Sequence, residues 1–241
     1  MLSNQSRRDA GQRETGWQAD PALAARAAAH AALGEPARLA IVEELVVSDR
    51  APKELGERLQ LPSNLLAHHL EVLEQAGLIL RAPSAGDGRR KYVHLARRTA
   101  ASLGVTSRSS VGEMLFLCTH NSARSQLAAA LWAARTGCRA RSAGTRPAAR
   151  VHRGAVAAAR RAGLSLAGAS PAALGDVPPG VQVVTVCDLV HEELEVAPTW
   201  WHWSIPDPVT DGDAATFDAV VAELDERIAA VRGSTEQGGT R

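Results

Sequence analysis

The chain has 241 residues, of which 45% are apolar, so the sequence can supply the packed cores of one or two domains. The net charge is +1, and the excess of positive charge is local, between residues 81 and 98. No apolar run approaches the roughly 20 residues of a membrane span, and the first 20 residues lack the apolar core of a signal peptide. We therefore predict a cytoplasmic protein without a membrane partner.

The first half of the sequence predicts helices followed by a β-hairpin. Residues 1–20 are polar and aperiodic, which predicts a disordered tail. Apolar spacing then predicts helices up to about residue 48, and residues 49–51 break the pattern. A short helix over 53–59, a turn at 61–63 and a longer helix to about residue 76 follow, with Gly77 as the stop. The segments 78–80 and 91–95, joined by the turn at 84–88, predict the hairpin.

This order of elements is typical of a winged helix-turn-helix DNA-binding domain, which we place at residues 21–97. The longer helix has an apolar face and a polar face, and the polar face suits the major groove. Basic residues at the hairpin tip suit contact with phosphates. The candidate DNA contacts are Ser63, Asn64, His68, Arg89, Arg90 and Lys91.

Three segments of this half resemble the ArsR family of bacterial repressors: LGEPARL at 33–39, ELGERL at 54–59 and LAHHLEVLEQAGL at 66–78. The resemblance implies a homodimer formed through this domain and bound to palindromic operator DNA. Arsenite-sensing relatives use cysteines, since a soft metalloid prefers thiolates, and this half has none. The adjacent His68 and His69 point about 100° apart on a helix and do not suggest a metal site.

Residues 98–112 show little pattern and are predicted to be a linker, after which strands and helices alternate. Such alternation predicts an α/β domain with a parallel sheet covered by helices. Strands are expected at 114–117, 139–142, 181–186 and 201–205. Helices are expected at 122–136, 151–162 and 217–231. We place this domain at residues 113–232 and a second disordered tail at 233–241.

The segment CTHNSARS at 118–125 predicts an oxyanion site. A strand ends at Cys118 and a helix begins soon after, so the loop amides and the helix N-terminus would stabilise a thiolate. Arg124 could hold two oxygens of a bound anion. The candidate anion-binding residues are Thr119, His120, Asn121, Ser122, Ala123, Arg124 and Ser125. Asp207, in WSIPDP at 203–208, is the candidate general acid.

These segments, with SAGT at 142–145, resemble the low-molecular-weight protein-tyrosine-phosphatase superfamily. The resemblance implies a four-stranded parallel sheet, Cys118 as nucleophile, Arg124 as anion clamp and Asp207 as acid. Phosphotyrosine phosphatases usually carry aromatic residues after the Asp-Pro pair, whereas Val209 and Thr210 follow here. We therefore favour a thiol-dependent arsenate reductase, in which Cys118 forms a thio-arsenate adduct.

Cys187 is the candidate resolving thiol, because it follows a predicted strand and its setting resembles the second cysteine of thioredoxin-linked arsenate reductases. Those enzymes have a third cysteine shortly afterwards, which is absent here. An external reductant (thioredoxin, a glutaredoxin-like protein or a small-molecule thiol) would complete the cycle, and no bound cofactor or metal is expected. Cys138 is expected to be structural, and residues 191–193 to cover the site.

Two alternatives stay open at this point. The phosphatase-like domain could sense arsenate or phosphate without turnover and so regulate DNA binding, or it could act as a phosphatase. The electron donor, the operator and the coupling between the two domains do not follow from the sequence.

Overall fold

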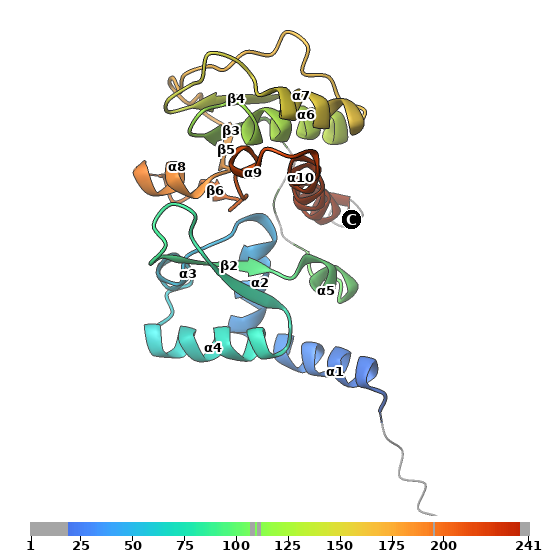
Figure 1. Cartoon of the computed structure of the whole chain (residues 1–241). Helices are drawn as coiled ribbons and strands as arrows, with labels where there is room; N and C mark the ends of the chain where they lie inside the picture. The colour runs from blue at the N-terminus through green and yellow to red at the C-terminus, as the bar shows by residue number, and fades with distance from the viewer. Residues whose placement is uncertain (1–18, 107–108, 110–111, 195, 237–241) are drawn as a thin grey trace, which may run out of the picture.

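The computed structural model describes residues 19–106, 109, 112–194 and 196–236. We call residues 19–106 the N-terminal half and residues 112–236 the C-terminal half (Figure 1). The N-terminal half consists of helices, one β-hairpin and a short final helix. Its elements are α1 (Pro21–Leu33), α2 (Pro36–Val47), α3 (Pro52–Leu59), α4 (Ser63–Gln75), β1 (Ile79–Pro83), β2 (Lys91–Leu95) and α5 (Arg97–Ser102).

Proline starts the first three helices, at Pro21, Pro36 and Pro52. Its fixed φ suits the first helical turn, where its missing N–H would have no partner in any case. Asp20 and Glu35 cap α1 and α2 by accepting from the amides of Leu23 and Arg38, each at 2.9 Å. The predicted tail at residues 1–20 otherwise lies outside the described residues.

Helices α3 and α4 follow one another in the N-terminal half with a short turn between them. Gln60 ends α3 in the left-handed region, at φ 54°, and α4 begins three residues later. The predicted apolar face of α4 is buried, and it consists of Leu66, His69, Leu70 and Leu73. The antiparallel hairpin then pairs Ile79 with Leu95.

The C-terminal half is an α/β domain with a four-stranded parallel sheet, as predicted, in the order β4-β3-β5-β6. Its strands are β3 (Met114–Cys118), β4 (Ala140–Gly144), β5 (Gln182–Thr185) and β6 (Trp201–His202). Its helices are α6 (Arg124–Thr136), α7 (Arg153–Arg161), α8 (Asp188–Glu193), α9 (Pro208–Asp211) and α10 (Ala214–Glu236). Every residue of β3 is buried, so this strand brings Cys118 to the carboxyl edge of the sheet from the centre of the core.

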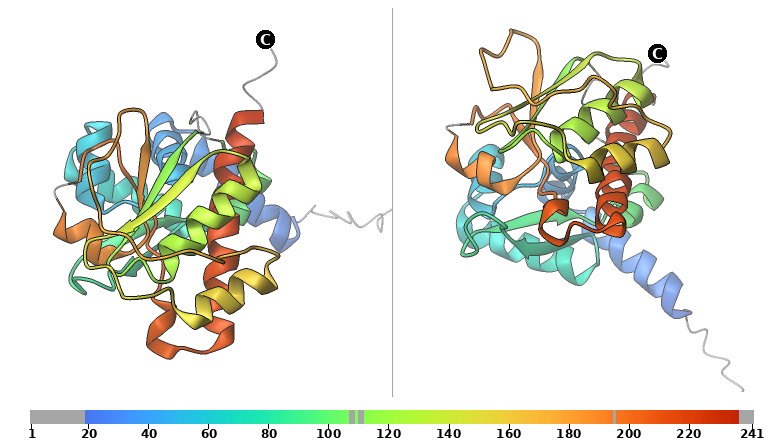
Figure 2. Two further views of the ribbon diagram at one scale, coloured as in Figure 1. Left: turned by 90° about the horizontal axis from the view of Figure 1, so that it is seen from above. Right: turned by 45° about the horizontal axis from the view of Figure 1, so that its top comes forward.

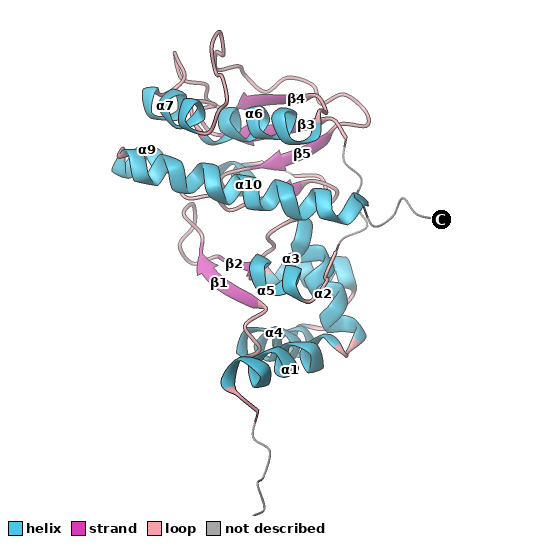
Figure 3. Cartoon of the chain, turned by 90° about the vertical axis from the view of Figure 1, so that its right-hand side faces the viewer, coloured by secondary structure: helices cyan, strands magenta, loops and turns pink. Residues whose placement is uncertain are grey.

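Two segments differ from the sequence predictions. The stretch expected to be a patternless linker, 98–112, begins inside helix α5. The last helix continues to Glu236, into the stretch expected to be a disordered tail. Part of the reason is tertiary packing, since α10 contacts α6 and α7 and also α2 and α5 (Figure 3). Figure 2 shows α10 alongside α6. No described helix has the length and apolar character to cross a bilayer.

The two halves share one hydrophobic core and a buried polar junction. The Asp49 amide donates to the His202 carbonyl at 2.7 Å, and the Trp203 indole donates to the Val47 carbonyl at 2.8 Å. The Asp49 carboxylate is fully buried and pairs with Arg227 of α10 at 2.8 Å. The halves are thus joined by contacts that neither could satisfy alone.

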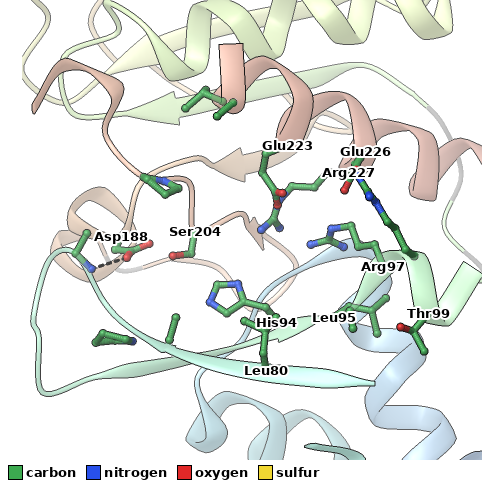
Figure 4. A pocket seen from close by; sticks show the side chains of 18 of the residues that line it. Leu80, His94, Leu95, Arg97, Thr99, Asp188, Ser204, Glu223, Glu226 and Arg227 are labelled. Carbon is green, nitrogen blue, oxygen red and sulfur yellow. Dashed lines mark hydrogen bonds and ion pairs between the residues drawn. The ribbon is translucent and has the colours of Figure 1, made fainter. Parts of the chain in front are cut away.

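A cavity of about 730 Å³ lies between the hairpin and α10. Figure 4 shows side chains from both halves around it, including His94 and Arg97 below and Glu223 and Arg227 above. The Arg227 guanidinium is already paired with Asp49 and Glu223, and Arg98 with Glu226. The lining is mainly apolar, and its charged side chains include Arg98 and Arg227, which form ion pairs between the halves with Glu226 and Asp49.

Candidate active site

The loop after β3 surrounds the sulfur of Cys118 with hydrogen-bond donors. Cys118 is 3% exposed and is the last residue of β3. The Asn121 amide donates to its Sγ at 3.2 Å, and the Ser125 hydroxyl lies 3.0 Å from the same atom. Such donors stabilise a thiolate, the nucleophilic form of cysteine.

A second layer of hydrogen bonds holds this loop in shape. Asn121 has a φ of 46°, which an L-residue adopts only when its surroundings compensate. Its side-chain oxygen accepts from the Ala172 amide at 2.9 Å and from the Gln126 amide group at 3.1 Å. Its side-chain nitrogen donates to Ser125 Oγ at 2.8 Å, so the Ser125 hydroxyl hydrogen is available to the Cys118 sulfur.

Sequence reasoning gave no structural role to two residues that shape the loop. Gln126 is a buried polar residue in the first turn of α6, directly after Arg124 and Ser125, and this position was the available signal. Gly144 lies so close that a Cβ there would come within 2.7 Å of the Thr119 carbonyl oxygen and 3.0 Å of the Asn121 amide. A glycine is therefore required where β4 passes beside the loop.

Arg124 and Asp207 meet at the mouth of the loop. Arg124 is 8% exposed, and it donates from Nη1 to the Ile205 carbonyl at 3.0 Å. Its Nη2 donates to Asp207 Oδ2 at 2.8 Å. Asp207 also caps the short helix α9 by accepting from the Val209 amide at 3.0 Å. The guanidinium is thus fixed on one side and faces a partly exposed carboxylate on the other.

A cavity of about 210 Å³ opens over Cys118. Its lining combines the loop with the segment that carries the acid. It consists of Cys118, His120, Ser122, Ala123, Arg124, Asp207, Val209 and Thr210. Within the described residues, this lining includes no phenylalanine, tyrosine or tryptophan, and its one ring is the imidazole of His120.

Residues 113–236, just over half of the chain, match the family model described as low molecular weight phosphotyrosine protein phosphatase. The chain belongs to this family. Among solved structures it is similar to an arsenate reductase from Archaeoglobus fulgidus DSM 4304, with 32% identity, 48% of this chain and 94% of that one covered, and a TM-score of 0.41. It is also similar to the thioredoxin-dependent arsenate reductase Cg_ArsC1' of Corynebacterium glutamicum, with 26% identity, 58% and 68% covered, and a TM-score of 0.44.

The N-terminal part is similar to the HTH-type transcriptional repressor SmtB of Mycobacterium tuberculosis (strain CDC 1551 / Oshkosh). The identity is 34% over 82 residues, which are 34% of this chain and 58% of that repressor. The chain thus spans a little over half of the length of this curated relative. It combines a region related to ArsR-family repressors with a phosphatase-family domain, as the sequence predicted.

Within the phosphatase-family domain, Cys187 lies next to the Cys118 strand. The Val186 amide donates to the Leu117 carbonyl at 2.7 Å, and the Cys187 Sγ is 3.5 Å from Thr119 Oγ1. Burial raises the pKa of the Cys187 thiol, although the nearby Arg124 guanidinium opposes this shift. Cys138 instead precedes β4 at the opposite edge of the sheet, away from the anion loop.

The remaining predicted residues of this family domain divide into two groups. Thr119 and Asn121 are buried within the loop, while His120 is exposed on the rim of the cavity. The expectation that residues 191–193 cover the site is not met. His191 and Glu192 face the N-terminal half, and Glu193 pairs with Arg146 at 2.9 Å.

The candidate DNA-contacting residues lie on two surfaces. Ser63, Asn64 and His68 are exposed on α4, and His69 is buried, so the two histidine side chains occupy different faces. On the hairpin, Arg89 and Lys91 are exposed. Arg90 differs, because its guanidinium lies 3.8 Å from the Glu192 carboxylate of the phosphatase-family domain.

Proposed function

We propose that this chain is a bifunctional ArsR-type transcriptional regulator and thiol-dependent arsenate reductase. The observation that carries the enzymatic part is the second buried thiol. Cys187 contacts Thr119, the residue after the nucleophile, so a second thiol lies beside the anion loop, buried behind the cavity that Cys118 lines. A phosphatase needs one thiol, whereas reduction of arsenic from the +5 to the +3 state needs two electrons, which two thiols supply on forming a disulfide.

The first step is formation of the adduct. Arsenate enters the cavity with its oxygens on the loop amides and the Arg124 guanidinium, displacing the Asp207 carboxylate from that guanidinium. The Cys118 thiolate attacks arsenic, the sulfur–arsenic bond forms, and one arsenic–oxygen bond breaks. Asp207, protonated beside the bound anion, transfers its proton so that the oxygen leaves as water.

The second step is reduction. The Cys187 sulfur attacks the Cys118 sulfur, a disulfide forms, and the electron pair of the sulfur–arsenic bond stays on arsenic, which leaves as arsenite. An external reductant (thioredoxin, a glutaredoxin-like protein or a small-molecule thiol) then reduces the disulfide and restores both thiols. The overall reaction converts arsenate and two thiols to arsenite, water and one disulfide.

The decisive experiment is a single turnover of the purified, fully reduced chain with arsenate under anaerobic conditions. We expect one arsenite for each chain, and a peptide map with Cys118 linked to Cys187. Cys118→Ser should release no arsenite, Cys187→Ser should trap the adduct, and Cys138→Ser should behave as wild type. Arsenite release by Cys118→Ser would refute the assignment of the nucleophile.

A phosphatase is the competing function, because the Cys118, Arg124 and Asp207 geometry would also suit phosphoryl transfer. Hydrolysis of an aryl phosphate, measured beside arsenate reduction, separates the two activities. Arsenate binding without disulfide formation or arsenite release would instead support a phosphatase-family domain that senses the oxyanion without turnover.

For the N-terminal half, we propose a winged helix-turn-helix at residues 21–97 that dimerises and binds operator DNA. The support is the similarity to SmtB, the exposed polar face of α4 and the basic hairpin tip. We also propose a linker at 98–112 and an enzymatic domain at 113–232. The protein is proposed to be cytoplasmic. Selection of duplexes from a random pool would give the operator. A palindromic consensus and a dimer in sedimentation are expected.

A further inference from the structure

Helix α8 of the phosphatase-family domain holds the loop of the β1–β2 hairpin (residues 84–90, hereafter the hairpin loop). Ser84 donates to Glu192 Oε1 at 2.7 Å, and the Asp87 amide donates to Glu192 Oε2 at 2.8 Å. The Ala85 amide donates to Asp188 Oδ2 at 2.8 Å, a bond drawn in Figure 4. Figure 1 shows the loop directly beneath α8. Two carboxylates of α8 thus bind the backbone of a loop that lies about 100 residues earlier in the sequence.

The same helix also holds α3, the first helix of the proposed helix-turn-helix. His191 Nε2 lies 3.2 Å from Glu54 Oε1 of α3. Tyr92 of β2 donates to Glu192 at 3.1 Å, so the hairpin is anchored on its strand as well as on its loop. Ser84, Tyr92, Asp188 and His191 are buried, which strengthens the carboxylate hydrogen bonds that they make, whereas Ala85 and Asp87 are exposed.

Helix α8 in turn rests on Cys187. This residue is the N-cap of α8, and its carbonyl accepts from the His191 amide at 3.3 Å. Asp188, which binds the hairpin loop, is the next residue in the chain. Because α8 is only six residues long, a change at its N-cap is transmitted to the whole helix.

Disulfide formation would move that N-cap. Cys118 and Cys187 are both free thiols in this structure, and Cys187 Sγ contacts Thr119 Oγ1 at 3.5 Å. A disulfide requires an S–S distance of about 2.05 Å and a Cβ–Cβ distance near 3.8 Å. A bond to the Cys118 sulfur takes the Cys187 sulfur out of its contact with Thr119, and we expect this change to shift the first turn of α8 relative to the anion loop.

We propose that the Cys118–Cys187 disulfide releases the hairpin loop and α3 from α8, and that the reduced chain binds DNA more tightly than the oxidised chain. This inference rests on the proposed function, because arsenate reduction is the reaction that would form the disulfide. The direction follows from exposure: the contacts with α8 use mainly backbone amides, Ser84 and Tyr92, while Arg89 and Lys91 stay exposed and Arg90 alone of these three cations lies near Glu192, at 3.8 Å. Helix α8 thus fixes the hairpin without covering Arg89 and Lys91. Once the hairpin is released from α8, it must be ordered again when DNA binds, and this loss of conformational entropy weakens binding.

The first test measures hydrogen exchange of the full chain by mass spectrometry, with the two cysteines reduced or linked. The linked state is prepared in parallel with arsenate and with diamide, a thiol oxidant, and is verified by peptide mapping. We expect faster exchange in peptides that cover residues 84–94 and 52–59, and unchanged exchange in α7. Cys187→Ser should show no change after either treatment.

The second test measures DNA affinity by fluorescence anisotropy, with a duplex selected from a random pool by the reduced chain. Linking the cysteines should weaken binding about 5- to 150-fold, the usual range of coupling between two sites. Glu192→Ala should weaken binding by the reduced chain and remove most of the effect of oxidation. Glu193→Ala is the matched control, since Glu193 pairs with Arg146 outside this contact.

The outcomes separate this inference from the proposed function. A disulfide that forms with arsenate but leaves exchange in the hairpin unchanged would overturn the coupling and leave the reductase intact. A disulfide that forms with diamide alone, and that loosens the hairpin, would support the coupling and count against arsenate reduction. Tighter DNA binding by Glu192→Ala, or failure of both oxidants to link the cysteines, would overturn the inference.

Discussion

Asp49 is the residue on which the junction between the halves depends most directly. Its carboxylate is fully buried, lies 2.8 Å from Arg227 Nη2, and accepts from the Ser204 amide at 2.8 Å. Asp49→Asn keeps the shape and one acceptor but removes the negative charge. Arg227 is itself 2% exposed, and within the described residues the substitution leaves Glu223, at 2.7 Å, to neutralise it, while Arg97 loses its pairing with Asp49 at 3.4 Å.

Removing one partner of a buried ion pair costs about 3–5 kcal/mol. Because Glu223 remains, we expect the lower end, about 3 kcal/mol, which is a large fraction of the roughly 5–15 kcal/mol that stabilises a folded protein. In a chain of this length, 1 kcal/mol shifts the melting temperature by about 2–4 °C, so Asp49→Asn should lower it by about 6–12 °C.

The pH dependence gives the same prediction a second readout. Burial alone raises the pKa of Asp49, but Arg227 and His94 outweigh this and hold it well below the usual range. A carboxyl with a lowered folded pKa stabilises the fold above its unfolded pKa of about 3.9, and this stabilisation is lost as the pH falls through the folded value. The difference between wild type and Asp49→Asn should therefore shrink below about pH 4.

The assay is thermal unfolding followed by circular dichroism at several pH values. Asp218→Asn is the matched control, because Asp218 forms an exposed pair with Arg161 at 2.6 Å that should contribute at most about 1 kcal/mol. If Asp49→Asn melted within 2 °C of wild type at pH 7, the buried junction would not stabilise the protein as reasoned here.

Three further predictions concern the anion loop. Gly144→Ala places a Cβ 2.7 Å from the Thr119 carbonyl oxygen and should weaken arsenate binding about 100-fold. Gly175→Ala is the control, because a Cβ there meets open space, and calorimetric titration should show unchanged affinity for this variant. Arg124→Lys loses the two-pronged contact and should weaken binding about 10- to 100-fold, and equal affinity would remove the proposed clamp. Since burial raises the pKa of Cys187, single-turnover arsenite release should accelerate about tenfold per pH unit near neutrality, and a flat profile would point to another resolving thiol.

The sequence predicts the anion loop well because its determinants are local. Strand β3, the turn and the start of α6 follow one another within about 12 residues, and the order of residue types fixes which groups surround the sulfur. The buried face of α4 is predicted for the same reason, since helical periodicity alone decides it. Arg124 and Asp207 lie 83 residues apart, and only the family resemblance could bring them together.

The junction between the halves escapes this kind of reasoning. The break predicted at residues 49–51 is correct locally, because α2 ends at Val47 and α3 begins at Pro52. Nothing near Asp49 in the sequence reveals that its partners are residues 204 and 227. The same holds for His191 and Glu192, which were expected over the anion site. Periodicity indicates that a residue is buried, but it does not indicate against which element.

Thr185 lies on a strand that was predicted only from its apolar character, yet its hydroxyl belongs to a polar network at the junction. Its hydroxyl lies 3.0 Å from His191 Nδ1 and 2.9 Å from His202 Nδ1, and the opposite ring nitrogens face Glu54 and Asp188. The Thr185 hydroxyl also lies 3.3 Å from the Trp201 carbonyl, to which it donates. The two imidazole rings stack with their centroids 4.1 Å apart, and burial lowers the pKa of His202. A polar chain from α3 to the hairpin loop therefore passes through a strand whose apolar pattern revealed only that it is buried.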